Sequence, residues 1–125
     1  MNREFKFRAW DKDENVMFYP VVIDYGDYSL RDLTGRWHDM INCELLQYIG
    51  LKDCNGREIY EGDILKITWG NGKIVNYKVK YLSECGYYIL IDINNKEDED
   101  IICIFDSSQI EIVGNIFETP KLAKL

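Results

Sequence analysis

The sequence has one histidine, two alanines and four cysteines, and no two cysteines stand at the CxxC spacing. A structural zinc site is typically built from clustered cysteines and histidines, so we expect no metal and no other cofactor. The default for scattered cysteines in a reducing compartment is the free thiol. We expect free thiols at Cys43, Cys54, Cys85 and Cys103.

Long apolar runs are also lacking. No run approaches the roughly 20 residues that a membrane-spanning helix requires. The first fifteen residues, "MNREFKFRAWDKDEN", alternate charged and aromatic side chains instead of forming the apolar stretch of a signal peptide. We therefore expect a cytoplasmic protein without membrane association.

Basic side chains are outnumbered by acidic ones, 15 to 22. The net charge is −7, with −3 over residues 1–50, +2 over residues 51–82 and −6 over residues 83–125. An acidic chain is repelled by the phosphate backbone, so we do not expect direct nucleic-acid binding. The middle segment is the one with a net positive charge, and we interpret four of its lysines as the solvated side of a strand: Lys66, Lys73, Lys78 and Lys80.

Recognisable catalytic motifs are missing as well, and neither GxGxxG nor GxxxxGK[ST] occurs. His38 follows Trp37 in a polar stretch with no serine or cysteine nucleophile beside it. We interpret a histidine in this setting as a surface or hydrogen-bonded residue and expect no enzymatic activity.

The segment "DKDEN" resembles the start of a calcium loop, with Asp11, Asp13 and Asn15 at the spacing of the first ligands. The loop's glycine is replaced by Val16, and Val22 stands where the bidentate glutamate belongs. We therefore predict no calcium site.

What the chain has instead is the pattern of β-strands, because β-branched residues dominate the aliphatic side chains and alanine is rare. In "EFKFRAW", Phe5, Phe7 and Ala9 share one face, while Lys6, Arg8 and Trp10 fall on the other, polar face. The run "VMFYPVVI" predicts a second strand, at a sheet edge because of its proline, and residues 24–40 predict short strands joined by turns. For "MINCELLQYIG" we expect a helical turn followed by a strand.

The strongest local signal is a hairpin. "DILKITW" and "IVNYKVKYL" alternate in polarity on either side of the Asn-Gly turn in "GNGK". Further strands are predicted at "YYILIDI", "IICIF" and "IEIVGNIF", with an acidic loop at "NNKEDED" and a 3₁₀ turn at "DSSQ". This order predicts a mainly β fold: a small barrel or sandwich with an SH3-like C-terminal half, an N-terminal β extension and one or two helical turns. We expect one domain over 1–125, with N-terminal strands at 1–50, a barrel-like region at 51–118 and a tail at 119–125.

The segment "KDCNGREIYEGDIL" we interpret as a structural motif. Asn55 and Gly56 supply a tight turn, Tyr60 is a candidate core anchor, and Gly62 marks a position where a side chain would clash or φ is positive. Asp63 is expected to accept backbone hydrogen bonds.

The functional alternative for this segment is a carboxylate cluster of Glu58, Glu61 and Asp63, but the sequence supplies no partner base or further ligand. For a binding surface, the candidates are three aromatic residues: Trp10, Tyr87 and Tyr88. Because Tyr87 and Tyr88 are adjacent, a regular strand directs one of them outward.

Three blocks carry a family resemblance: "KFRAWD" with Met17 in the following strand, "QYIGLKDCNGREIYEGDIL", and "VGNIFETP". On these blocks the chain resembles the YopX family of phage and prophage proteins, over nearly its whole length. Ile49 stands where the family usually has threonine and Cys54 where it usually has lysine. The resemblance implies a small, mainly β protein of a phage or prophage in the bacterial cytoplasm, and it implies no activity.

Three functions fit these observations. The first is a non-enzymatic accessory protein that binds a host or phage protein, or itself as a homo-oligomer, through a sheet edge or an aromatic patch. The second is a nucleic-acid-related or anti-defence role, acting through the acidic "NKEDED" loop or the lysines of residues 66–80. The third is an RNase of the SH3-like toxin type, which Arg57 alone supports poorly because no histidine occurs in the barrel region.

Overall fold

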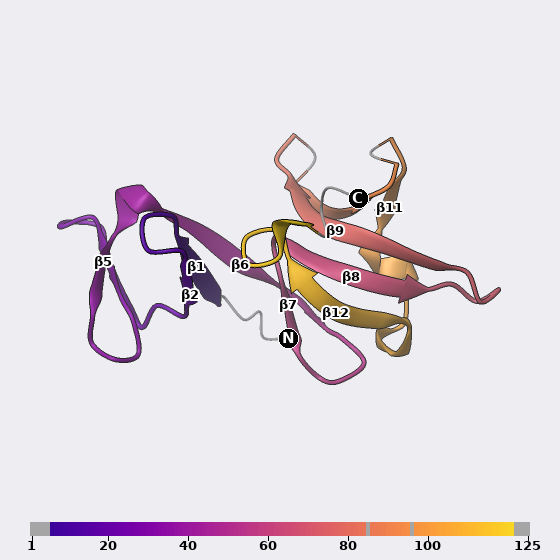
Figure 1. Ribbon diagram of the computed structural model, residues 1–125, viewed down its shortest axis with the longest axis horizontal. Helices are drawn as coiled ribbons and strands as arrows, with labels where there is room; N and C mark the ends of the chain where they lie inside the picture. Colours follow the sequence, from indigo (N-terminus) through magenta and orange to yellow (C-terminus); the bar gives the residue numbers. More distant parts are fainter. Residues whose placement is uncertain (1–5, 85, 96, 122–125) are drawn as a thin grey trace. The chain divides into compact units, whose positions relative to one another are not determined.

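The computed structural model describes residues 6–84, 86–95 and 97–121. The chain is mainly β, as predicted, and its only described helices are short 3₁₀ turns (Figure 1). Two compact units are present, Met1–Tyr48 and Ile49–Leu125. That they act as one domain stays a prediction. Phe5, Cys85 and the tail residues 122–125 lie outside the described residues.

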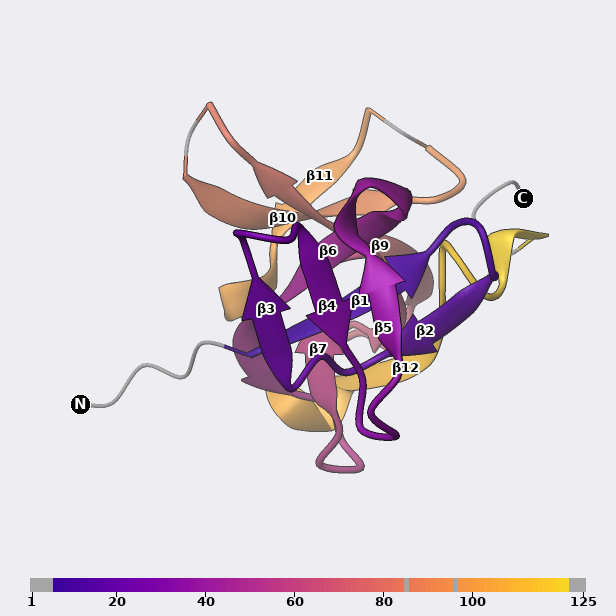
Figure 2. The same ribbon diagram turned by 90° about the vertical axis from the view of Figure 1, so that its left-hand side faces the viewer.

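The first unit holds two small antiparallel sheets. In the first, β1 (Phe7–Asp11) lies between β2 (Val16–Phe18) and β6 (Cys43–Lys52). The second has the order β3 (Val22–Asp24), β4 (Ser29–Arg31) and β5 (Trp37–Asp39), which lie side by side in Figure 2. The 3₁₀ turn η1 (Met40–Asn42) leads from β5 into β6, the helical turn and strand expected there.

The prediction of one strand over "VMFYPVVI" was wrong, because β2 ends at Phe18 and β3 begins at Val22. Pro20 lies in the gap, where its missing N–H removes no ladder hydrogen bond. The two resulting strands belong to different sheets.

Fully or nearly fully buried apolar side chains of the first unit come from both sheets: Ala9 and Phe18 from the first, Leu30 from the second. Ile23, Met40, Cys43 and Leu45 pack against them. This core fixes which face of the β3-β4-β5 sheet points inward.

The second unit contains a five-stranded antiparallel sheet in the order β11-β10-β9-β8-β12 (Figure 1). Its strands are β8 (Asp63–Thr68), β9 (Ile74–Leu82), β10 (Tyr87–Asp92), β11 (Glu99–Ile101) and β12 (Ile110–Asn115). The end of β6 neighbours the short strand β7 (Glu58–Tyr60). The predicted β8-β9 hairpin is confirmed, and the predicted inward faces contribute Leu65, Ile67, Tyr77 and Val79 to the core.

The strand predicted at "IICIF" was misplaced, because only Ile101 of that segment belongs to the observed strand, which begins earlier, at Glu99. β11 ends at Ile101, and a 3₁₀ turn, η2 (Ile102–Ile104), follows. The apolar run does not alternate across a sheet, because Ile102 enters the core while Ile104 is exposed. At "DSSQ" the predicted 3₁₀ turn is present as η3 (Ser107–Gln109), with Asp106 and Gln109 forming a capping box.

Within the described ranges, no helix combines the length and the apolar character needed to cross a membrane.

Candidate functional site

The segment predicted to be structural forms tight, hydrogen-bonded turns in the second unit. Gly56 has φ +78° and Gly62 has φ +85°, both in the left-handed region that favours glycine. Asn55 lies in the turn between β6 and β7, where its N–H donates to the Asp53 carboxylate over 3.0 Å. Tyr60 is 3% exposed.

Asp63, 1% exposed, accepts a hydrogen bond from the Tyr60 N–H over 2.8 Å. The alternative carboxylate cluster would need its ligand atoms to converge. In the described part of the chain, the only group of three potential ligands that do so lies elsewhere and includes none of Glu58, Glu61 and Asp63.

The three aromatic residues proposed for a surface lie in different settings. Trp10 is 9% exposed in the central strand β1, so the exposed anchor expected there is not present. Its flanking residues in β1 are buried as well, because both faces of the strand are covered, whereas the alternation of "EFKFRAW" suggested one polar face. Tyr87 is 45% exposed, whereas Tyr88 packs against the second unit's core and meets Tyr81 edge-on.

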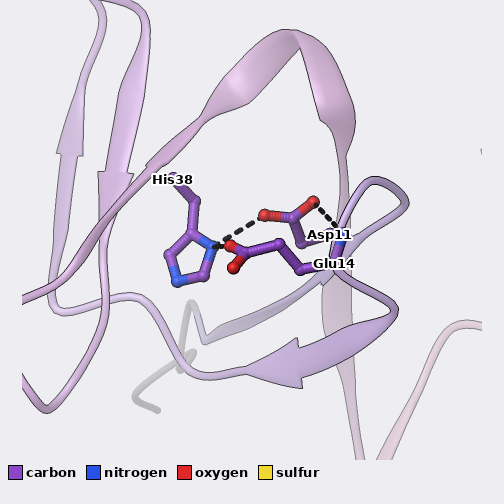
Figure 3. Close-up of side chains that lie close together, drawn as sticks. All are labelled: Asp11, Glu14 and His38. Atoms are coloured by element: carbon purple, nitrogen blue, oxygen red, sulfur yellow. Dashed lines mark hydrogen bonds and ion pairs between the residues drawn. The ribbon is translucent and has the colours of Figure 1, made fainter.

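A cluster that the sequence did not reveal lies in the first unit, around the only histidine. His38 in β5 faces Asp11 at the end of β1, Glu14 in the β1–β2 turn and Asp32 in the β4–β5 loop. Figure 3 shows the side chains of Asp11 and Glu14 directed at the same ring nitrogen of His38. We refer to these four residues as the His38 cluster.

Both ring nitrogens of His38 are engaged. Nδ1 lies 2.8 Å from Asp11 Oδ2 and 3.3 Å from Glu14 Oε2, and Nε2 lies 2.9 Å from Asp32 Oδ2. The ring also stacks on Phe18, with centroids 3.9 Å apart and planes inclined by 14°. These contacts leave the imidazole one orientation.

The carboxylates are held in place by local turns. Asp11 Oδ1 accepts from the N–H groups of Asp13 and Glu14 over 2.9 and 3.1 Å, the pattern of an Asx turn. Asp32 Oδ1 accepts from the backbone and hydroxyl of Thr34, over 2.9 and 2.6 Å. One oxygen of each aspartate is thereby fixed, and the other is directed at the histidine.

Burial and charge act in opposite directions on His38, which is 3% exposed. Burial favours the neutral ring, but the hydrogen bonds to Asp32 and Asp11 outweigh it and raise the pKa of His38. Burial likewise opposes ionisation of Asp11, yet hydrogen bonds from His38 and the turn N–H groups lower its pKa overall. Hydrogen bonds from Thr34 and His38 lower the pKa of Asp32.

The expectation of a surface or hydrogen-bonded histidine was therefore right about the hydrogen bonds, while His38 is buried. The calcium-loop residues Asp13 and Asn15 are not members of the cluster. Of the cluster's carboxylates, only Asp11 stands in a sequence pattern typical of ligands, the calcium-loop spacing of "DKDEN".

The β3-β4-β5 sheet has one inward face, which carries His38, and one exposed face. Ile23, Leu30 and His38 stand opposite one another in the register and form the inward row. The neighbouring row, Val22, Arg31 and Trp37, therefore points outward. Val22 is 38% and Trp37 50% exposed, and Arg31 is exposed between them. We call Val22, Arg31 and Trp37 the outer row.

The first unit also exposes other large apolar residues. Exposed large apolar side chains in the described part of the first unit are Val16, Tyr19, Val21, Val22, Tyr25, Tyr28, Leu33, Trp37 and Ile41. Tryptophan, tyrosine and arginine are the residue types that dominate binding energy at protein interfaces.

Comparison with known proteins gives the fold independent support. The chain is similar to protein EF1440 from Enterococcus faecalis, with 24% identity and a TM-score of 0.68. The match covers 98% of this chain and 99% of that one. It matches protein yopX from Bacillus subtilis with 24% identity and a TM-score of 0.61, covering 98% of this chain and 97% of that one. No curated protein matches.

These likenesses concern the fold. The family match concerns the sequence, and it extends over residues 6–124, almost the whole chain. The three blocks that carried the resemblance lie inside that range. The chain belongs to the YopX protein family.

Proposed function

We propose that this protein is a non-enzymatic accessory protein of a phage or prophage, which acts in the bacterial cytoplasm by binding another protein through the outer row. The observation that carries the proposal is the exposure of Trp37 beside Arg31 and Val22 on a sheet whose other face is buried. The structural relatives from Enterococcus faecalis and Bacillus subtilis are consistent with a bacterial setting.

Charge selects the kind of partner. The first unit carries a net charge of −3 and the whole chain −7. On the outer face of the sheet, Asp24 and Asp39 flank the outer row in the register. A second copy would bring like charges together, whereas a partner with an apolar patch bordered by lysine and arginine would be attracted. The proposed partner is therefore a different protein with an apolar patch bordered by basic residues.

The test replaces Trp37 and measures binding. Tagged wild-type protein, Trp37→Ser and the control Ile74→Ser are used to capture partners from prophage-induced cells. Ile74 is 56% exposed in the second unit, so the control removes a comparable apolar surface far along the chain from the outer row. We expect a protein that wild type and Ile74→Ser retain and Trp37→Ser loses.

The captured protein is then purified and its affinity measured by calorimetry. Truncation of a central interface tryptophan costs about 2 kcal/mol or more, which is about thirtyfold in Kd. Binding that weakens as salt rises supports the charge argument. Equal binding by Trp37→Ser and wild type refutes the proposal, and so does light scattering that finds a dimer which Trp37→Ser dissociates.

A further inference from the structure

We propose that Asp11, Glu14 and His38 form a binding site for one divalent transition-metal ion, of the class to which zinc belongs. The proposal stands on the first unit alone and does not depend on the proposed function. One ligand atom from each residue lies within 4.8 Å of the other two. His38 contributes Nδ1, which faces Asp11 Oδ2 and Glu14 Oε2.

The separations suit an ion. Nδ1 is 2.8 Å from the Asp11 oxygen and 3.3 Å from the Glu14 oxygen. Ligands at about 2.0–2.1 Å from a tetrahedral zinc ion stand about 3.3 Å from each other. Small side-chain movements therefore suffice to admit an ion between the three atoms, because Glu14 and its ion-pair partner Arg36 are both exposed and can shift together.

The second atom of each ligand is held by a partner outside the site. Asp11 Oδ1 accepts from two turn N–H groups, and Glu14 Oε1 pairs with the guanidinium of Arg36. His38 Nε2 lies 2.9 Å from Asp32 Oδ2, which places a carboxylate behind the imidazole. A carboxylate in this position is the usual outer partner of a metal-bound histidine, where it fixes the ring and increases its basicity.

This outer arrangement distinguishes the site from a patch of acidic side chains. Each ligand is oriented by one atom and presents the other to a common point, and two of the three ligands are buried. Pre-orientation by outer partners is what makes metal ligands effective.

The ligand types select the ion. Calcium and magnesium prefer oxygen ligands, while an imidazole nitrogen suits zinc, iron, nickel and copper. One nitrogen and two carboxylate oxygens therefore favour a borderline transition metal over the hard cations. Three protein ligands leave at least one position for water.

Binding would replace a proton. In the metal-free cluster, Nδ1 faces two carboxylates and is protonated when the ring is charged. The ion takes the Nδ1 lone pair, the Nδ1 proton leaves to solvent, and Nε2–H remains directed at Asp32. The ion would join the β1–β2 turn, which carries Glu14, to β5.

The primary test is calorimetric titration of the untagged full chain with zinc chloride. It is done in a Cys54→Ser background, because Cys54 is an exposed free thiol and thiols are themselves zinc ligands. We expect one ion per chain, with calcium and magnesium binding at least tenfold more weakly.

Two variants localise the site. Glu14→Gln removes a ligand from an exposed side chain and is expected to weaken zinc binding at least tenfold. Asp13→Asn is the matched control: it removes the same charge from the same turn at an exposed residue outside the cluster, and it is expected to change the affinity less than twofold.

His38 offers a direct readout because it is the only histidine in the sequence. Its two ring ¹⁵N signals can be assigned without a variant. We expect zinc to shift the Nδ1 signal and leave Nε2 protonated. Absence of zinc binding in the parent chain, equal loss in Glu14→Gln and Asp13→Asn, or unchanged His38 signals at saturating zinc would each overturn the proposal and leave the cluster as an ionic hydrogen-bond network.

Discussion

Replacing Gly62 with alanine tests whether the 53–63 segment has a structural role and stabilises the fold. Gly62 has φ +85°, and a Cβ built on it would lie 2.7 Å from Cε2 of Phe117, closer than real Cβ contacts come. Its backbone is tied on both sides, because its N–H donates to the Val79 carbonyl over 3.0 Å and its carbonyl accepts from the Ile116 N–H over 2.9 Å. The backbone therefore has little freedom to move away from the added methyl group.

Two effects add in Gly62→Ala. A left-handed conformation costs an L-residue about 1–2 kcal/mol. An extra methyl group forced against a packed ring costs about 1–3 kcal/mol, less if the ring turns aside. The free energy of unfolding should therefore fall by about 2–5 kcal/mol, a large part of the 5–15 kcal/mol typical of a domain.

Gly56→Ala is the matched control. Gly56 has φ +78°, but an added Cβ meets nothing within 4 Å, so only the conformational cost applies. In urea denaturation, Gly56→Ala should lose less free energy of unfolding than Gly62→Ala does. The difference between the two losses should be about 1–3 kcal/mol, the cost of the clash with Phe117. In a Phe117→Ala background the extra loss of Gly62→Ala should disappear. Equal losses for both glycines, or no coupling to Phe117, would refute the packing argument.

Three further predictions concern titratable groups. Asp53→Ala should lower the free energy of unfolding by about 2–3 kcal/mol in urea, because the buried carboxylate accepts three backbone N–H hydrogen bonds; an unchanged midpoint would contradict this. With a chelator present, thermal stability should fall as pH rises through the pKa of His38, which is raised above 6.5. Thermal stability should also fall in acid, as Asp11, whose pKa is lowered from 3.8, takes up a proton. A flat profile above pH 6 would show that His38 is not stabilised as a cation. Mass mapping after brief alkylation should find Cys54 modified before Cys43, because burial and the Asp11 carboxylate raise the pKa of Cys43 to about 11; faster modification of Cys43 would contradict this.

The sequence predicted the second unit better than the first for a physical reason. β8 and β9 have 6 and 9 residues, long enough for polarity to alternate several times, and an Asn-Gly turn joins them. β3, β4 and β5 have 3 residues each, too few for periodicity to show which side chains point inward. His38 and Trp37 are neighbours in the sequence, and only the register with β4 reveals that one is buried and the other exposed.

The His38 cluster could not be predicted from the sequence, for a related reason. Asp11 and His38 are 27 positions apart, on strands of different sheets. Their contact depends on how the two sheets close over Phe18 and Leu30, which no local pattern encodes. A lone histidine with scattered aspartates has no metal-ligand spacing to recognise, although the folded chain brings the ligand atoms together.

The two proposals meet on β5, where Trp37 points outward and His38 inward. A strand of 3 residues has few ladder hydrogen bonds, so contacts made by its inward side chain contribute to its order. An ion held by His38 and the β1–β2 turn would favour the ordered strand and so raise the affinity of Trp37 for a partner. By linkage, a bound partner would raise the affinity for the ion by the same factor. Zinc should therefore tighten partner binding by the wild-type chain and leave it unchanged in Glu14→Gln. Equal tightening in both chains would show that the two faces of the sheet act separately.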